Sequence, residues 1–549
     1  MTSEIATSTA ATSSVLARGS AEDSAGRTSF GQLVRSEWVK FRSVRGWVVG
    51  MIVAALLTVL LGVFAAGNAS IGCQTSPNGP QLTGKACTPP VPIGPGGEAV
   101  TDSFYFVRQP LAGNGSITVR VTSLTGVHAT GNGGGQAARN PLAGMTKGLV
   151  PWSKAGILIA TGTRAGSAYA AMLVTGSHGV RMQYNYTHDA AGLPGLVSAA
   201  APRWLRLTRS ADVVTGYDSA DGEHWHVVGT ARLTGLTGTV QAGMFVASPL
   251  YTHMQPFFGG SSAQIGPSQA TGVFDSVRLH GTWPAASWTG DNIGGGKYSA
   301  GTGIGGFYRA GPSFTVTGSG DIAPIVPGAA AGVPTTTIEQ PLTGVFVGLI
   351  AVVVVAAMFM TAEYRRGVIR VTFAASPRRG RVLAAKGVVV GMAAFVVGLV
   401  ASLLAIWLGL PRARNGGLVL LPVSLLTEAR VIVGTAALVA VTAVLAVALG
   451  AILRRSAAAV TAAIVVIVLP YLLSVTVLPA NVAAWVLRLT PAAGFAIEQS
   501  FPRYPQIDAI YSPAGGYYPL PAWAGFAVVC GYAAIALGAA LVLIRRRDA

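Results

Sequence analysis

The segment from residue 363 to residue 386 concentrates charge, with seven Lys and Arg side chains and one carboxylate. Its most distinctive residues are Glu363, Tyr364, Arg365, Arg366, Gly367, Pro377 and Arg378. Gly367 loosens a helix and Ser376–Pro377 forces a turn, so the pattern predicts a short helical hairpin. Such side chains break no bonds, but they can recognise a partner protein through ion pairs. The alternative interpretation is ordinary basic charge beside membrane spans.

A second group of charged residues lies near the start of the chain, where an amphipathic helix is predicted over 29–46. Apolar residues recur there at three- and four-residue spacing, and Ser29 with Gln32 fits a capping box at its start. The polar and interfacial positions are Glu37, Trp38, Lys40 and Arg42. This pattern favours a helix lying in a membrane interface, over the simpler alternative of a basic flank to a membrane anchor.

A third group contains carboxylates and histidines: Asp218, Asp221, Glu223, His224 and His226. Glycoside hydrolysis with retention needs two carboxyl groups about 5.5 Å apart. However, Asp221–Gly222 is typical of a hairpin turn, and the two histidines lack a third metal ligand at fixed spacing. We therefore expect a solvated hairpin here, with no catalytic residue and no metal site.

The chain also lacks a nucleotide-binding loop of its own. The nearest approach, Gly294–Gly295–Gly296–Lys297, continues with Tyr298 instead of Ser or Thr and lacks the upstream glycine. We expect no cofactor on this chain, so ATP and magnesium would have to bind a partner subunit.

Six uncharged apolar runs are each long enough to cross a bilayer, and they predict an α-helical polytopic membrane protein. They cover 47–66, 342–361, 387–410, 431–452, 456–478 and 522–544. Sixteen Lys and Arg residues flank one side of these runs, against five in the short loops on the other side. Positive residues in short loops stay inside. The prediction is a multi-pass plasma-membrane protein with both termini cytoplasmic and a disordered tail over 1–28.

The net charge of +18 follows from this layout. The insert over 67–341 has 15 basic and 11 acidic residues, so most of the excess lies beside the spans, where anionic lipids attract it. No basic soluble domain is left to bind nucleic acid. The absence of charge inside the spans also disfavours an ion-coupled secondary transporter.

The insert itself changes to a period of two and predicts a large all-β extracytoplasmic domain. Strand-like stretches occur at 116–122, 156–161, 169–175, 203–209, 212–218, 225–230 and 240–247. Many short strands without helical patterning indicate a β-sandwich or jelly roll. Cys73 and Cys87, just after the first span, are a disulfide candidate, since an oxidising compartment favours one.

Several motifs resemble the permeases of type-2 ABC exporters over 30–66 and 342–549. Glu363–Gly367 with Pro377, Arg378 and Lys386 is similar to the family's first cytoplasmic loop, and 33–43 is similar to its connecting helix. The resemblance implies that loop 362–386 is a coupling helix seated on a separate ATPase subunit, and that a second permease copy completes the transporter. The large insert departs from ordinary members, which have a short first outer loop.

Residues 101–280 resemble a concanavalin-A-like lectin/glucanase sandwich, on the stretches at 154–159, 202–209, 216–225 and 273–277. The family's catalytic Glu-x-Asp-x-x-Glu pattern is missing. Trp204, Tyr217 and Trp225 could stack on an envelope glycan, but such aromatics are more often core residues.

The sequence thus favours the transmembrane subunit of an ATP-driven exporter. The alternative is a membrane-anchored protein that binds a glycan or envelope component through its outer β-sandwich.

Overall fold

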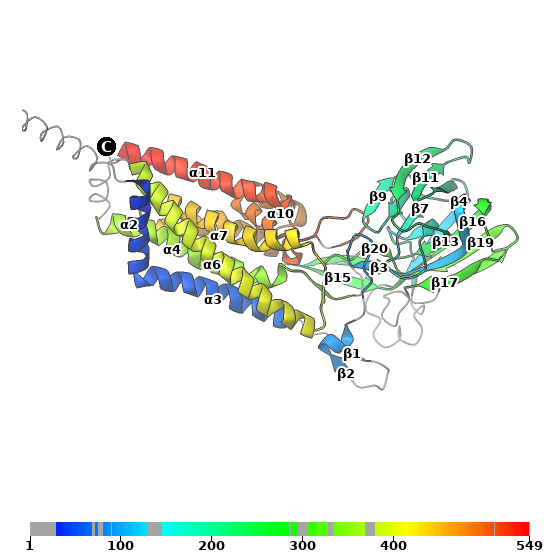
Figure 1. Ribbon diagram of the computed structural model, residues 1–549, viewed down its shortest axis with the longest axis horizontal. Helices are drawn as coiled ribbons and strands as arrows, with labels where there is room; N and C mark the ends of the chain where they lie inside the picture. Colours follow the sequence, from blue (N-terminus) through cyan, green and yellow to red (C-terminus); the bar gives the residue numbers. More distant parts are fainter. Residues whose placement is uncertain are drawn as a thin grey trace, which may run out of the picture.

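The computed structural model describes most of the chain, namely residues 29–68, 72–74, 81–88, 91–129, 145–257, 260–284, 287–294, 305–327, 333–367, 379–509 and 511–547. It contains a bundle of long helices and a large β-domain, which lie end to end (Figure 1). The β-domain is inserted between the first and second long helices of the bundle. The predicted tail, residues 1–28, lies outside the described residues, as do residues 368–378 of the predicted coupling loop.

Six helices in the described part of the chain are long and apolar enough to cross a membrane. They are α3 (Arg45–Gly67), α4 (Val345–Arg365, extended by the 3-10 turn Gln340–Gly344), α6 (Arg379–Asn415), α7 (Leu425–Leu453), the composite helix Ser456–Thr476 and α11 (Ala522–Arg547). Five of the six contain the apolar run predicted for them, and the composite helix ends at Thr476, two residues before the end of the predicted run 456–478. α6 is much longer than its run because its first turns also carry charged residues.

The composite helix is interrupted where a proline enters it. α8 (Ser456–Ala463) leads into a π-helical turn, Ile464–Val468, and α9 (Leu469–Thr476) follows. Pro470 has no backbone N–H to donate, so the regular ladder is locally lost and the widened turn precedes it. Beyond it, α10 (Ala480–Leu489) and the fully buried 3-10 helix η4 (Pro491–Glu498) pack back against the bundle, η4 lying on α7 and α11.

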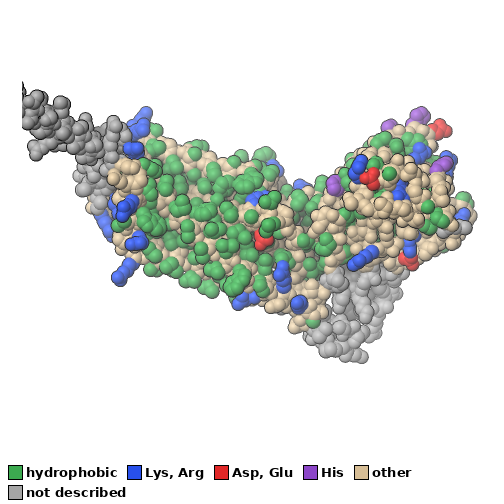
Figure 2. Space-filling view, in the orientation of Figure 1, with side chains coloured by type: hydrophobic (Ala, Val, Ile, Leu, Met, Phe, Trp, Pro, Cys, Tyr) green, Lys and Arg blue, Asp and Glu red, His purple; other side chains and the backbone are tan. Residues whose placement is uncertain are grey.

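The shorter helix α2 (Phe30–Ser43) crosses the end of the bundle farthest from the β-domain (Figure 1). It begins as predicted, because the Gln32 side chain accepts a hydrogen bond from the Ser29 backbone N–H at 3.0 Å. The C-terminal end of α11 lies at the same end of the bundle. Lys and Arg side chains gather there, while the length of the bundle presents a nearly continuous apolar surface (Figure 2). We call this the basic end.

The β-domain is an antiparallel sandwich built around one long strand, β4 (Phe104–His128), which takes part in both layers. One layer has the order β12 (His226–Arg232), β11 (Val213–Ser219), β10 (Arg203–Ser210), β4, β16 (Ser268–Thr282), β19 (Ser313–Gly318) and β18 (Gly306–Ala310). The other has the order β9 (His188–Ala191), β8 (Val180–Tyr184), β7 (Tyr169–Thr175), β6 (Lys154–Ala160), β13 (Thr239–Ala247), β4 and β17 (Thr289–Ile293). Each of the seven predicted strands overlaps one of these.

The sandwich core lies between the layers, where Val119 and Leu205 face Ile157 and Met172, all fully buried. Alternation of apolar and polar residues in β10 and β11 matches their single buried face. β6 and β7 are buried at every position because a second core covers their other face. Short strand pairs complete the insert: β1 (Gly72–Gln74) with β2 (Gln81–Thr83), β3 (Val100–Asp102) with β20 (Ile322–Pro324), β14 (Tyr251–Phe257) with β15 (Gly260–Gly266), β5 (Thr146–Lys147) on β4, and β21 (Thr335–Thr336) on β22 (Val419–Leu420).

The β-domain enters and leaves the bundle at one place. Gly62, near the end of α3, lies so close to the returning chain that a Cβ atom there would be 1.9 Å from the Pro341 carbonyl oxygen. The domain also contacts the segment after η4, because the Gln506 amide donates to the Tyr186 carbonyl at 3.2 Å. Cys87 is disulfide-bonded and Cys530 is a free thiol. The Cys73 side chain lies outside the described residues, so its pairing with Cys87 stays a prediction.

Candidate functional site

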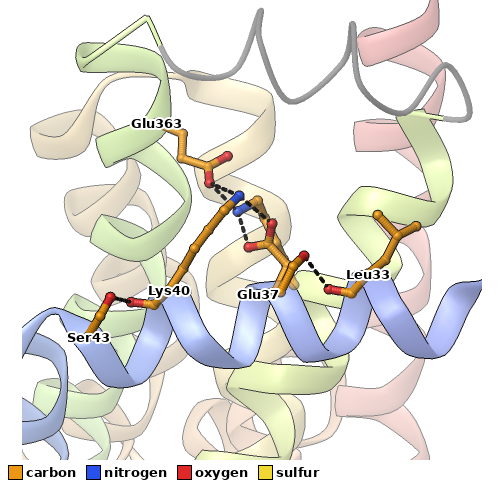
Figure 3. Close-up of polar contacts among 7 residues, drawn as sticks. Leu33, Glu37, Lys40, Ser43 and Glu363 are labelled. Atoms are coloured by element: carbon orange, nitrogen blue, oxygen red, sulfur yellow. Dashed lines mark hydrogen bonds and ion pairs between the residues drawn. The ribbon is translucent and has the colours of Figure 1, made fainter. Parts of the chain in front are cut away.

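Four charged side chains meet at the basic end, on three different elements. Glu37 and Lys40 come from α2, Glu363 from the last turn of α4 and Lys386 from the start of α6. We call these four residues the ion-pair cluster. In Figure 3, Glu37 and Lys40 rise from α2 toward Glu363 above it. The cluster therefore lies where α2 crosses the two helices that flank residues 368–378.

Lys386 is at the centre of the ion-pair cluster. Its Nζ donates to Glu37 Oε2 at 2.6 Å and to Glu363 Oε1 at 2.7 Å. Lys40 Nζ repeats the pattern, with Glu37 Oε1 at 2.7 Å and Glu363 Oε1 at 3.2 Å. Two ammonium groups thus balance two carboxylates, and each cation bridges both anions.

Burial makes this arrangement energetically important. The side chains of Lys386 and Glu37 are 0% and 2% exposed. A buried charge is tolerated only with well-placed opposite charges, and removing one partner costs about 3–5 kcal/mol. Lys386 gains further from the Phe359 ring, whose centre is 4.8 Å from its Nζ. Partial burial lowers the pKa of Lys40, but hydrogen bonds and charge from Glu37 and Glu363 outweigh this and leave that pKa raised.

Aromatic packing fixes the angle at which α2 crosses the bundle. Phe41 is buried, and its ring meets that of Phe359 edge-on at 5.6 Å. Trp47, at the start of α3, meets the same ring from another side at 6.2 Å. Because Glu37 and Phe41 are one helical turn apart, one face of α2 provides both the ionic and the aromatic contact. Trp38 and Arg42 lie on other faces and are exposed.

The predicted coupling residues divide into two groups. Arg365, Arg366 and Gly367 are exposed at the end of α4, as a docking surface requires. Glu363 differs from the prediction, because its carboxylate points inward and accepts from two lysines instead of facing a partner. The reason is the buried ammonium of Lys386, which needs a second anion besides Glu37. Tyr364 is half-buried, with the Arg454 guanidinium 5.2 Å from its ring centre.

Pro377 and Arg378 lie outside the described residues. Lys386 ends the predicted loop and is not among the predicted coupling residues, yet it is the central residue of the cluster. A usable signal existed: Lys386 is followed directly by an uncharged run, so the helix carries it into the bundle.

The third group of residues, in the β-domain, forms a self-contained turn. Asp221 accepts hydrogen bonds from the backbone N–H groups of Glu223 and His224 and from the His224 ring, and these bonds hold its pKa far below the usual value. Asp218 is buried and accepts from Leu193 N–H. The described residues contain no group of three His, Cys, Asp or Glu side chains arranged to hold a metal ion.

Trp204 and Trp225 are only half-buried, contrary to the expectation that they belong to the core. Arginines cover them instead. The Arg206 guanidinium is 3.8 Å from the centre of the Trp225 ring, and Arg120 and Arg278 lie 5.7 and 5.6 Å from Trp204. Trp204 and Arg206 lie on the outward face of β10, with Arg120 on β4 and Arg278 on β16, because the alternate positions face the core. Trp225 lies in the turn just before β12.

No protein-family model and no curated protein matches this chain. Solved structures match parts of the chain at low similarity. A functionally unknown protein from Saccharomyces cerevisiae matches at 15% identity over 40% of this chain and 88% of its own, with a TM-score of 0.22. Scytalido-glutamic peptidase with a transition-state analogue inhibitor matches at 6% identity over 41% of this chain and 100% of its own, with a TM-score of 0.24. A mutant of the GH43 protein BlXynB from Bacillus licheniformis matches at 14% identity over 31% of this chain and 28% of its own, with a TM-score of 0.17. At these TM-scores, none of the likenesses bears on activity.

Proposed function

We propose that this chain is the membrane-spanning permease subunit of an ATP-driven ABC exporter, with ATP hydrolysed by a separate subunit docked at the basic end. The observation that carries the proposal is the ion-pair cluster. Its ion pairs join α2 to α4 and α6, the two helices that flank the coupling loop. A force applied to the loop would therefore move α2, α4 and α6 together.

The layout of the described chain supports membrane insertion in this orientation. Six candidate spans share one apolar surface, and cations collect at one end of it. Positive residues favour the cytoplasmic side, so the proposal has α2, both termini and loop 362–386 inside and the β-domain outside. The exposed apolar face of α2, which includes Trp38, suits the lipid interface.

Arg365 and Arg366 are the docking residues in this proposal, because they are exposed and follow Glu363 within one helical turn. A partner that moves this end of α4 would displace Glu363. Through the ion pairs of Lys386, the movement would pass to α6 and, through Glu37, to α2. The cations would meet acidic groups on the ATPase, and a second permease copy would complete the transporter.

The alternative proposal is a membrane-anchored protein whose outer domain binds an anionic glycan or another envelope component. It draws on Trp204 and Trp225, which are not core residues but lie with their arginines on one face of the sandwich. A single anchor would serve such a role, so the other five apolar helices favour the exporter.

Affinity purification from the native membrane tests the proposal. We expect the tagged wild-type chain to retain a nucleotide-binding ATPase, and the charge-reversed variant Arg365→Glu/Arg366→Glu to lose it. Arg455→Glu is the matched control, because Arg455 is also exposed and lies in the loop between α7 and α8 at the basic end.

Thermal unfolding of the same samples separates docking from misfolding. The double variant should unfold at the wild-type temperature, because neither arginine takes part in the cluster. If no ATPase is recovered with the wild type even after cross-linking in the membrane, the exporter proposal is wrong, and binding of the outer domain to anionic glycans should be measured instead.

A further inference from the structure

At the opposite end of the bundle, two carboxylates are buried, and no Lys or Arg in the described part of the chain forms an ion pair with either of them. Glu339 precedes the 3-10 turn that leads into α4, and Glu498 ends η4. Both lie outside the six candidate spans, and both line one small cavity of about 30 Å³. Phe346, Tyr471 and Tyr518 also line it. We call this site the carboxylate pocket.

The oxygens of these carboxylates are poorly satisfied. Glu339 is only 6% exposed, and neither of its carboxylate oxygens has a partner in hydrogen-bond geometry. Glu498 Oε1 has the Thr435 hydroxyl at 3.2 Å, but the same hydroxyl lies 2.7 Å from the Val431 carbonyl oxygen. A hydroxyl has one hydrogen to donate, so Glu498 receives at most a share of it.

The charge in the pocket is also unbalanced. Arg430 on α7 is the cation whose charge acts on Glu339, but its guanidinium donates to the Gln499 carbonyl, and its Nε has no partner. Two ionised carboxylates and one guanidinium leave a net charge of −1. An isolated buried ion costs far more than a fold can supply, so one further positive charge is required.

The backbone around Glu339 leaves room for its oxygens. Gly516 adopts a left-handed conformation with φ of +86°, and a Cβ atom there would lie 2.6 Å from Glu339 Oε1. Glycine at this position therefore keeps one side of the carboxylate open. The cavity volume corresponds to one or two water-sized particles.

From this geometry we infer that the carboxylate pocket is a binding site for a single monovalent cation, held between Glu339 and Glu498 on the side of the bundle that faces the β-domain. The ligand is either Na⁺ or a proton, since both supply one positive charge to oxygen ligands. The inference stands apart from the proposed function, because it needs neither an ATPase nor transport.

Burial supports a site of this kind. It raises the pKa of Glu339 to about 7, against a smaller lowering by the hydroxyls of Ser500 and Thr337, which lie near the carboxylate but outside hydrogen-bond geometry. It raises the pKa of Glu498 to about 8, with the charge of Glu339 adding to the effect. Near neutral pH the pocket is therefore poised between holding a proton and holding another cation.

Thermal unfolding of the full chain in detergent tests the inference, at pH 6 and pH 8.5, in NaCl and in choline chloride of equal ionic strength. If Na⁺ is the ligand, Na⁺ raises the apparent Tm at pH 8.5 by about 2 °C or more. Glu339→Gln and Glu498→Gln abolish that shift. If the proton is the ligand, the apparent Tm falls from pH 6 to pH 8.5 equally in both salts, and the same variants flatten the fall.

Glu428→Gln is the matched control, since Glu428 lies on α7 in the turn before Arg430 but does not line the pocket. It should keep the wild-type response to both salt and pH. The infrared C=O band of a protonated carboxyl gives a second measurement that does not depend on the stability of a variant. In the wild type this band should disappear when the pH is raised or, if Na⁺ binds, when Na⁺ is added at intermediate pH. A wild type whose Tm and carboxyl band respond to neither Na⁺ nor pH would overturn the inference, as would variants whose responses match those of Glu428→Gln.

Discussion

The ion-pair cluster and the carboxylate pocket are both buried and both built around two glutamates, yet their charges are handled in opposite ways. In the cluster, Glu37 and Glu363 share two lysines at 2.6–3.2 Å, so the charge is closed within the protein. In the pocket, neither carboxylate oxygen of Glu339 has a partner in hydrogen-bond geometry among the described residues, and the proposed cation or proton supplies the missing charge. A cluster whose charges balance can hold helices together, while a pocket with an unbalanced charge can bind a cation or a proton from solution.

The largest expected effect comes from opening the cluster. Lys386→Met removes the buried ammonium and leaves Glu37 with only the half-exposed Lys40. We expect a loss of about 3–5 kcal/mol in the free energy of unfolding, seen as a lower apparent Tm. Adding Glu37→Gln should recover part of the loss, because the uncompensated carboxylate is then removed as well. Lys147→Met, on an exposed strand of the β-domain, should leave the Tm unchanged.

The aromatic contact beside the cluster should follow closely in size. Phe41→Ala removes a buried ring from the contact with Phe359 and should cost about 3 kcal/mol. Trp38→Ala is the matched comparison, since Trp38 is a larger ring on the same helix but is 43% exposed. Equal destabilisation by the two substitutions, measured by thermal unfolding, would show that packing does not hold α2 against the bundle.

The same substitution should have opposite signs at the two sites. Glu37→Gln weakens bonds to two lysines and should destabilise by about 2 kcal/mol. Glu339→Gln should stabilise by a similar amount at pH 8.5 in choline chloride, because it removes a buried charge. The pKa of Glu339 is raised to about 7 in the folded state, so above the pKa of the unfolded state the unfolded chain binds fewer protons than the folded protein. The free energy of unfolding therefore falls as the pH rises through 7. At pH 6 the gain should therefore shrink, and a gain independent of pH would contradict this account.

The smallest expected effect concerns the start of α2. Gln32→Ala removes the acceptor for the Ser29 N–H and should cost about 0.5–1 kcal/mol, since one helix end loses a single cap bond. Hydrogen exchange of the first turn of α2 would measure it. Comparison with Lys386→Met then separates the local stability of α2 from its attachment to the bundle.

Much of the architecture could be predicted from the sequence because both periodicities are strong. The apolar runs locate the six long helices, and the period of two locates seven strands, although β6 and β7 prove to be buried on both faces. The amphipathic pattern of 29–46 gives α2 and its cap. What the pattern does not give is that Glu363 turns inward, because its local signature is the same as that of the exposed Arg365 and Arg366. For Lys386 the only signal is the uncharged run that follows it directly.

The carboxylate pocket could not be found from the sequence for a related reason. A search for charge within the apolar runs passes over Glu339, which lies in the linker before α4, and Glu498, which lies in a short loop. Their burial depends on η4 folding back against α7 and α11, a contact between segments that are distant in the chain. The prediction that Trp204 and Trp225 are core residues is wrong because the arginines that cover them come partly from other strands.

The close approach of Gly62 to Pro341 has a consequence for how such a chain could arise. The chain returns to the bundle beside the place where it left it. The helices before and after the insert therefore pack together directly at the point of insertion. A module of this kind can be gained, exchanged or trimmed by joining the chain near residues 68 and 334 without disturbing the order of the remaining helices. Removal of the domain would expose the surface around Gln506 and Ile507, which contacts the sandwich.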